Sequence, residues 1–326
     1  MKASAKAPAN IAFIKYWGKA DETLRLPLND SLSMNLTGAH TITTVEFDPA
    51  LIEDSVDIIG GEFSEHEKAR VIKGLTRIRE RAGSELRARV VTKNTFPKGA
   101  GSAASASGFA ALTMAGFAAL GTVLSEKEQT IFARLGSGSA CRSIPDGFAV
   151  WEKGTDSQSS YAYSLHPADY WDIRDILVIV DKRMKKVSTT DGMERVTTSP
   201  KLAARLNAVP RRMAVIREAL EKKDFALFGS VTEEDCLDMH AVMQSQVPPL
   251  RYWSPVTQRI MAHVVRLRAE GIPVYFTIDA GPNVHIICVG NDEPRVAESV
   301  MKLPGIEEII YNKPARGAHI VSTHLF

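Results

Sequence analysis

The chain has 326 residues, of which 44% are hydrophobic and 24% charged, a composition typical of a folded globular protein. Its 40 basic and 38 acidic residues leave a formal net charge of +2, which does not favour a nucleic-acid-binding protein or one with an acidic tail. Three cysteines without metal-ligand spacing, no signal-peptide pattern and no apolar stretch long enough to span a bilayer predict a cytoplasmic protein without nucleic-acid or membrane partners.

The first half of the chain mixes predicted strands and helices. Residues rich in Thr, Val and Ile predict strands over 40–48, 56–59 and 87–95. Between the last two, Ser64 and Glu67 form a capping box that predicts the start of a helix. Another capping box, Ser125 with Glu128, predicts a helix that ends at Gly136. Residues 177–180 read as a short apolar strand at the centre of a sheet.

The second half is more helical. Apolar residues at helical spacing predict helices over 209–223 and 224–243, and Ser254-Pro255 begins a helix that stops at Gly271. Strands return at 274–278, 284–289 and 318–323. The whole pattern indicates an α+β fold in which helices are layered on sheets, with a division near residues 180–195.

A stretch of glycines, small residues and hydroxyls over residues 96–108 runs directly into an apolar helix. The N-terminus of a helix offers free N–H groups and a partial positive charge, so an anion such as phosphate suits this turn. Ser105 and Ser107 can add hydroxyl contacts. The stretch matches neither the P-loop nor the dinucleotide-binding motif.

Three further clusters contain residues that can carry chemistry, and each also has a purely structural reading. Residues 7–19 offer two lysines, a tyrosine and a tryptophan for an anionic substrate, or a solvated edge of a sheet. In residues 136–143, Arg142 can clamp a carboxylate, or the segment is a helix C-terminus entering a tight turn. Asp279 follows an apolar run, where it can be a general base or the cap of a turn.

Together, these segments resemble the GHMP kinase superfamily, specifically its mevalonate diphosphate decarboxylase branch, which also includes phosphomevalonate decarboxylases. The matching segments occur in the family's order and span nearly the whole chain. They are Asn10-Ile-Ala, Lys15-Tyr-Trp-Gly-Lys19, Pro97 to Leu112, Gly136-Ser-Gly-Ser-Ala-Cys-Arg142, Val187-Ser-Thr-Thr-Asp-Gly-Met193 and Asp279-Ala-Gly-Pro-Asn283.

The resemblance implies a reaction in the mevalonate pathway of isoprenoid biosynthesis. ATP phosphorylates the 3-hydroxyl of a 5-phosphorylated mevalonate, and loss of phosphate and CO2 then leaves an alkene. By similarity, Asp279 accepts or orients the hydroxyl proton, and Arg142 holds the substrate carboxylate with help from Asn10. Lys15 stands near the reacting centre. The residues implied to receive the substrate phosphate are Tyr16, Lys19, Ser139, Ser188 and Thr189.

The resemblance also implies how ATP binds and how the chain is organised. The residues implied to cradle the ATP phosphates are Lys98, Gly99, Gly101, Ser102, Ser105 and Ser107. Mg2+ is expected to accompany ATP, although the sequence assigns no ligands to it. The family fold places the site in a cleft between an N-terminal nucleotide-binding lobe, residues 1–185, and a C-terminal lobe, residues 186–326. Relatives suggest a homodimer.

Departures from the family pattern bear on the substrate. Lys98, Gly99, Ser102 and Ala104 replace the Thr, Ala, Leu and first Ser that the family loop usually carries. Asp191 adds a carboxylate beside the segment implied to bind the substrate phosphate, and its charge would repel a diphosphate more than a monophosphate. The predicted substrate is therefore mevalonate 5-phosphate, giving isopentenyl phosphate. The alternatives are mevalonate 5-diphosphate giving isopentenyl diphosphate, a plain GHMP small-molecule kinase, and a non-catalytic sensor.

Overall fold

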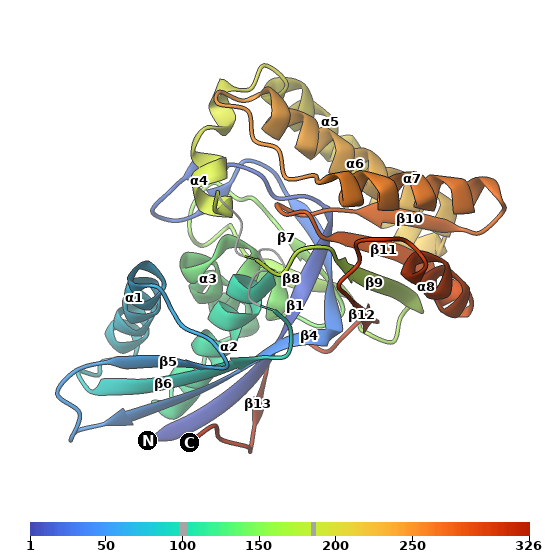
Figure 1. The fold of residues 1–326 in the computed structure, drawn as a ribbon. Helices are drawn as coiled ribbons and strands as arrows, with labels where there is room; N and C mark the ends of the chain where they lie inside the picture. Colours follow the sequence, from blue (N-terminus) through green and yellow to red (C-terminus); the bar gives the residue numbers. More distant parts are fainter. Residues whose placement is uncertain (98–102, 184–186) are drawn as a thin grey trace.

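The computed structural model describes residues 1–97, 103–183 and 187–326, and it confirms an α+β fold of sheets layered with helices (Figure 1). The described strands are β1 (Lys2–Ile14), β2 (Lys19–Asp21), β3 (Leu26–Pro27), β4 (Ser31–Asp48), β5 (Ser55–Ile59), β6 (Arg87–Asn94), β7 (Phe148–Trp151), β8 (Ala162–His166), β9 (Ile173–Ile179), β10 (Val274–Thr277), β11 (Val284–Val289), β12 (Glu308–Asn312) and β13 (His319–Val321). The described helices are α1 (Glu65–Ala82), α2 (Ala103–Ala119), α3 (Glu126–Gly136), α4 (Thr189–Glu194), α5 (Leu202–Lys222), α6 (Phe225–Ser245), α7 (Pro255–Ala269) and α8 (Glu293–Met301), with short 3-10 turns η1 (Gly138–Ser143), η2 (Val196–Thr198) and η3 (Gly290–Asp292).

The larger sheet is built on two long antiparallel strands, β1 and β4, in the order β13-β1-β4-β6-β5. One end of β4 pairs with β6 and the other with β7, which in turn pairs with β8. Helices α1 and α2 pack against this sheet, and their buried apolar side chains form one core with those of β4, β5 and β6. Helix α2 is apolar on all sides because it lies between the sheet and the helices α1 and α3.

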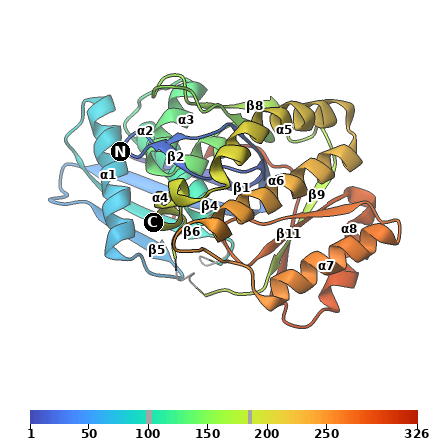
Figure 2. The same ribbon diagram turned by 90° about the horizontal axis from the view of Figure 1, so that it is seen from above.

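The smaller sheet is antiparallel throughout, in the order β10-β11-β9-β12. Its β9 has a neighbour on each side, as expected of the central strand predicted near residues 177–180. Helices α6, α7 and α8 contribute buried residues to its core. The view from above shows α5, α6 and α7 on the side of the molecule that carries this sheet, away from α1 (Figure 2).

The two termini lie side by side at one edge of the larger sheet, because β13 pairs with β1 (Figure 1). The returning segment passes very close to the turn after η1. A Cβ atom on Gly317 would lie 2.1 Å from the carbonyl oxygen of Ile144, so only glycine fits. This close approach lets Ala318 donate a backbone hydrogen bond of 2.9 Å to the Ser143 carbonyl.

Local signals in the sequence set most helix starts. The capping boxes at Ser64 and Ser125 are both present, and the helix predicted from Ser254-Pro255 also begins there. Helix α5 differs, since it begins at Leu202 and continues through Pro210, where the expected helix had its start. The predicted strand 40–48 is the second half of the longer β4.

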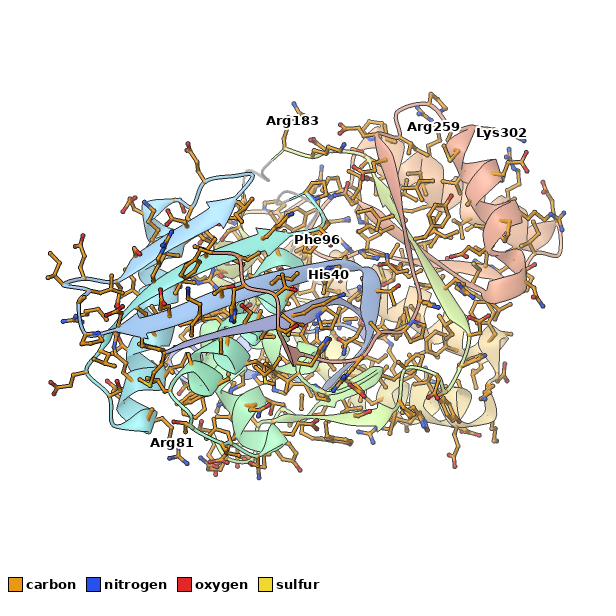
Figure 3. The ribbon with its side chains drawn as sticks, turned by 90° about the horizontal axis from the view of Figure 1, so that it is seen from below. His40, Arg81, Phe96, Arg183, Arg259 and Lys302 are labelled. Atoms are coloured by element: carbon orange, nitrogen blue, oxygen red, sulfur yellow. The ribbon has the colours of Figure 1, made fainter. Side chains whose placement is uncertain are left out.

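Several charged side chains at the periphery are paired with an opposite charge. Arg81, Arg183, Arg259 and Lys302 project outward in Figure 3, and three of them form ion pairs with nearby carboxylates. Such exposed pairs neutralise the surface locally and contribute little to stability. Of the described helices, none combines the length and apolar character that crossing a membrane requires.

The Gly317 contact predicts a specific loss of stability. Gly317→Ala should lower the free energy of unfolding by about 1–3 kcal/mol, because the methyl group meets backbone that cannot rotate away. Gly61→Ala is the matched control, since its Cβ would meet only Ile58 Cγ2 at 3.9 Å. Urea denaturation of both variants checks the prediction, and equal stability of the two would contradict it.

Candidate active site

A single cavity of about 370 Å3 collects most of the predicted site residues. Its walls come from α1, β5, β6, α2, η1 and α4, together with the segments that follow β1 and β10. The predicted residues that line it are Lys15, Tyr16, Lys19, Ser105, Ser139, Arg142, Ser188, Thr189 and Asp279. Asn10 and Ser107 lie behind its wall. Lys98, Gly99, Gly101 and Ser102 fall outside the described residues.

Lys15 and Asp279 form an ion pair at the centre of the cavity. Lys15 is the first residue after β1, and Asp279 lies two residues after β10. Lys15 Nζ lies 2.6 Å from Asp279 Oδ1, and the two side chains are 2% and 22% exposed. Burial raises the pKa of Asp279, but the charges of Lys15, His285 and Arg142 and the Lys15 hydrogen bond hold it below its usual value. Asp279 is therefore a carboxylate at neutral pH.

Arg142 is a buried guanidinium without an acidic partner among the described residues. It lies on η1, donates 2.7 Å to Ser31 Oγ and 3.2 Å to Asn10 Oδ1, and its Nε has no hydrogen-bond partner. Burial lowers the pKa of Arg142, which shows the cost of holding its charge away from water. An anion entering the cavity would relieve this cost, and the planar fork of guanidinium suits a carboxylate.

Asn10 acts from behind the cavity wall rather than inside the cavity. Its amide donates to the carbonyl of Ser139 at 3.1 Å and to Ser143 Oγ at 2.8 Å, while its oxygen accepts from Arg142. These bonds fix the 3-10 turn against β1. Asn10 is therefore placed to hold the Arg142 guanidinium in position, and its assisting role stays a prediction.

The end of the cavity near η1 is basic. Lys19 is paired with Glu22, whose side chain is 61% exposed. Arg25 and Arg70 also line this end, and both donate to carbonyls at the end of α3. Burial, and to a smaller extent the charge of Arg25, lower the pKa of Arg70 to about 10. Arg25 has a φ of 52°, an unusual left-handed backbone for a residue with a side chain.

Tyr16 closes the same basic end with its phenol. Its ring packs edge-on against Trp151 with centroids 4.7 Å apart, and a Cβ on Gly138 would lie 2.8 Å from Tyr16 Cε1. The glycine is thus required for the ring to lie on η1. Burial raises the pKa of Tyr16 far above its usual value, so the phenol stays protonated and can donate a hydrogen bond to an anion.

The segment 188–191 places hydroxyls, but not its carboxylate, on the cavity. Ser188 caps α4, and Ser188, Thr189 and Thr190 all line the cavity. Asp191 is exposed and absent from the lining. The expectation that Asp191 would repel a second phosphate is therefore not supported, because a solvated carboxylate outside the cavity is screened.

The cavity also has an apolar arm that the sequence pattern does not reveal. This arm lies between α1 and the strands β5 and β6, and the apolar residues that line it are Val56, Ile58, Phe63, Val71, Val90, Phe109 and Leu112. Ser64, His66 and Glu67 add polar atoms at its rim. The apolar face of α1 reads in the sequence as a face that packs on the core, so only the fold shows that part of it borders a cavity.

The start of α2 joins the apolar arm to the centre of the cavity. Ser105 lines the cavity and its Oγ lies 3.1 Å from Ser137 Oγ, whereas Ser107 is fully buried and bonds to Thr41 Oγ1 at 2.6 Å. Ser107 thus ties α2 to β4. Within the described parts of the chain, no three His, Cys, Asp or Glu side chains are grouped so that they could hold a metal.

The cysteines give a direct test of burial around the site. Cys141 lies on η1 and Cys236 on α6, and burial raises the pKa of their thiols to about 12 and about 11. Burial also raises the pKa of Cys288. Because only the thiolate form of a cysteine attacks a disulfide reagent, the native protein should resist Ellman's reagent at pH 8. With the urea-unfolded protein, the reagent should release one equivalent of its coloured thiolate for each of the three cysteines. Rapid labelling of the native protein would contradict the buried positions.

Comparison with known proteins connects this geometry with a family. A family model described as "Diphosphomevalonate decarboxylase-like N-terminal domain" matches residues 7–162, and one described as "Mevalonate 5-diphosphate decarboxylase C-terminal domain" matches residues 176–320. The diphosphomevalonate decarboxylase of Ganoderma lucidum is 36% identical over 92% of this chain and 82% of its own length.

Solved structures agree over almost the whole length. The mevalonate diphosphate decarboxylase of Staphylococcus aureus superposes with a TM-score of 0.94 at 37% identity, covering 98% of each chain. A complex of MDDEF with MVAPP, AMPPCP and magnesium superposes with a TM-score of 0.93 at 38% identity, covering 99% of each chain. These likenesses extend over both sheets and all the elements that line the cavity.

Proposed function

The chain belongs to the diphosphomevalonate decarboxylase family, and we propose that it converts mevalonate 5-diphosphate and ATP into isopentenyl diphosphate, ADP, phosphate and CO2. The observation that carries this proposal is the convergence of Asp279, Lys15 and Arg142 on one cavity. Asp279 is an ionised acceptor, and Arg142 is a buried cation without an acidic partner among the described residues. A small hydroxy acid supplies both a hydroxyl proton for the first and a carboxylate for the second.

Phosphoryl transfer is the first step, and Asp279 prepares the attacking oxygen. Its carboxylate accepts a hydrogen bond from the tertiary 3-hydroxyl and takes the proton as the new O–P bond forms and the bond from the γ-phosphorus of ATP to the departing ADP breaks. Because Lys15 lowers the pKa of Asp279, the residue is a weak base that works chiefly by orienting the hydroxyl. This is sufficient for a loose transition state, in which positioning and charge stabilisation dominate.

Decarboxylation is the second step, and Arg142 holds the carboxylate that leaves as CO2. Departure of the 3-phosphate takes the C–O bonding pair and leaves positive character on the tertiary carbon. The electrons of the bond to the carboxyl carbon then form the alkene. Lys15, with its side chain 2% exposed, stabilises the developing negative charge on the departing phosphate.

The apolar arm suits the base of the nucleotide. It is walled by aliphatic and aromatic side chains, and it leads to Ser105 near the start of α2, where phosphates are favoured. Nucleotide phosphates normally bring Mg2+, which needs only one or two protein oxygens and takes the rest from phosphate and water. The Ser105 hydroxyl is an oxygen donor on this cavity that fits that demand, and the ion would neutralise phosphate charge there.

The basic end of the cavity favours a diphosphate over the monophosphate predicted from the sequence. Lys19, Arg25 and Arg70 line it, whereas Asp191 does not. Arg25 and Arg70 also border an adjoining depression with Lys73 and Arg77. A second phosphate adds negative charge that these cations can neutralise. The relatives also support the diphosphate, because their names specify a diphosphate substrate.

The homodimer, the cytoplasmic location and the lobes 1–185 and 186–326 stay predictions.

Asp279→Asn tests the catalytic role directly. Removing the acceptor charge should lower kcat by about 10²–10⁴-fold, because an amide neither takes the hydroxyl proton nor holds the hydroxyl as the carboxylate does, while substrate binding is retained. Release of CO2 and release of ADP should fall together, since phosphorylation precedes decarboxylation. Both products are measured in the same assay, and near-normal turnover would refute the assignment.

A substrate series with Arg25→Gln tests the phosphate count. The wild-type kcat/KM should be highest for mevalonate 5-diphosphate, lower for the 5-phosphate and lowest for mevalonate. Arg25→Gln should raise KM for the diphosphate by about tenfold, equivalent to about 1.4 kcal/mol, and leave KM for the monophosphate nearly unchanged. Arg81→Gln, on the outer surface of α1, is the control for loss of a charge. A wild-type preference for the monophosphate would overturn the proposed substrate.

A further inference from the structure

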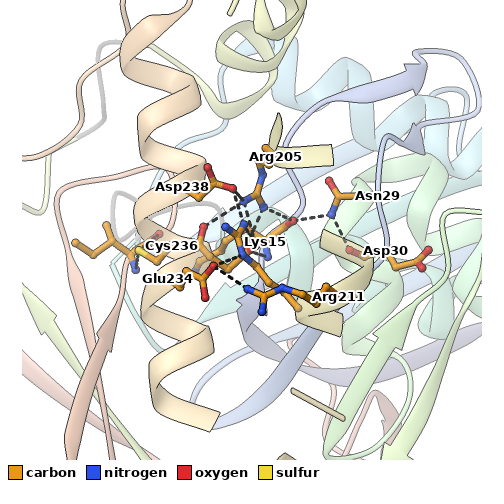
Figure 4. Close-up of polar contacts among 11 residues, drawn as sticks. Lys15, Asn29, Asp30, Arg205, Arg211, Glu234, Cys236 and Asp238 are labelled. Atoms are coloured by element: carbon orange, nitrogen blue, oxygen red, sulfur yellow. Dashed lines mark hydrogen bonds and ion pairs between the residues drawn. The ribbon is translucent and has the colours of Figure 1, made fainter. Parts of the chain in front are cut away.

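The backbone of Lys15 is held by side chains from outside its own sheet. β1 ends at Ile14, so the N–H and C=O groups of Lys15 lie beyond the strand pairing. The N–H donates to Asp235 Oδ2 at 2.7 Å, and the carbonyl accepts from Arg205 Nη2 at 3.2 Å and Asn29 Nδ2 at 3.0 Å (Figure 4). Both backbone groups of this residue are therefore fixed.

The Asp235 carboxylate that binds Lys15 is itself rigid. Arg205 on α5 donates to both its oxygens, at 3.0 and 3.1 Å, and the two side chains are fully buried. Arg212 approaches the same carboxylate at 3.4 Å, and Asp238 accepts from Arg205 and Arg212. A two-pronged guanidinium–carboxylate pair has a fixed geometry, and the attraction between its opposite charges offsets part of the cost of burying them.

A second face of α6 holds the backbone next to Asp279. Ile278 precedes Asp279; its N–H donates to Cys236 Sγ at 3.1 Å, and its carbonyl lies 3.2 Å from His240 Nε2. Burial lowers the pKa of His240 to about 3, so the ring is neutral at working pH. A carbonyl only accepts hydrogen bonds, and hence Nε2 must carry the proton. Positions 236 and 240 are one helical turn apart and share a face.

Helix α6 therefore forms hydrogen bonds to both backbone segments that carry the central ion pair. Asp235 binds the segment at Lys15, and His240 binds the segment just before Asp279. We propose that Asp235 and His240 are positioning residues that set the Lys15–Asp279 geometry, with Arg205 holding Asp235 in place. This inference rests on the roles proposed above for Lys15 and Asp279. Neither positioning residue lines the cavity, so neither contacts the substrate.

The pH profile separates positioning from mere stability. The charged and titratable groups that act on Asp279 are Lys15, His285 and Arg142, with His240 behind its backbone. If the Lys15 ammonium retreats, burial of Asp279 is no longer offset and its pKa rises. The acid limb of kcat should then move to higher pH, by about one unit or more for loss of a close opposite charge.

The experiment compares an apolar with a conservative replacement at each position. His240→Leu and Asp235→Ala should lower kcat by roughly ten- to a hundred-fold, the effect of a misplaced catalytic group, with KM for both substrates nearly unchanged. Both variants should shift the acid limb upward. His240→Gln keeps a donor for the Ile278 carbonyl, and Asp235→Asn keeps an acceptor for the Lys15 N–H. Each of these variants should therefore have a higher kcat than the apolar variant, and an acid limb closer to that of the wild type.

Asp54→Asn is the matched control. Asp54 is a buried carboxylate that also accepts from an arginine, Arg79, at 2.8 and 2.9 Å, and from a backbone N–H, that of Ala88, at 2.8 Å. It is not among the cavity lining. The variant should lower Tm and leave the acid limb where it is, which shows the effect expected of lost stability alone.

The outcomes separate the two proposals. A lower Tm with unchanged kcat and acid limb in His240→Leu would overturn the positioning role, as would failure of His240→Gln to differ from His240→Leu. If Asp235→Ala does not fold, the two His240 variants decide the question. Near-normal turnover of Asp279→Asn would instead overturn the proposed function, whatever the α6 variants do.

Discussion

The ion pair between Lys15 and Asp279 is the contact on which the rest of the site depends. Its two partners come from opposite parts of the fold, because one follows the first strand of the larger sheet and the other follows an edge strand of the smaller sheet. Closing this pair at 2.6 Å requires both sheets to hold their positions within a fraction of an ångström. Helix α6 lies against both segments, so it transmits the placement of one sheet to the other.

Around this pair, the molecule keeps positive charge without neutralising it. Arg142 has only neutral hydrogen-bond partners among the described residues, and Arg25 and Arg70 donate to the ends of a helix. A protein that binds nothing at this place would gain by pairing or exposing these groups. The substrate proposed here, with a carboxylate and two phosphates, would complete the pairing, and binding energy would then be released where the chemistry occurs.

The sequence predicted the site residues that belong to short local motifs. It did not predict the residues that only the tertiary structure brings near the site. Asp279 and Arg142 stand in short segments with recognisable spacing, and both line the cavity. Asp235 and His240 sit in the middle of an ordinary amphipathic helix, where the pattern shows only burial. Asp191 misled the substrate prediction, because a sequence places a charge near a motif without showing which way it points. The fold class was predictable from alternating patterns and capping boxes.

Because β13 pairs with β1, the chain leaves the larger sheet, forms the smaller sheet and then returns to the larger one. The smaller sheet is therefore inserted within the larger one in the sequence and does not simply follow it. A fragment cut once between the two sheets would keep β1 but lose β13, which pairs with residues 4–6 on its outer side. The bare backbone N–H and C=O groups along that side would then be a template for another chain. Fragments that contain only one of the two sheets should therefore aggregate in solution. Complementation between the two fragments should be efficient only when they are co-expressed.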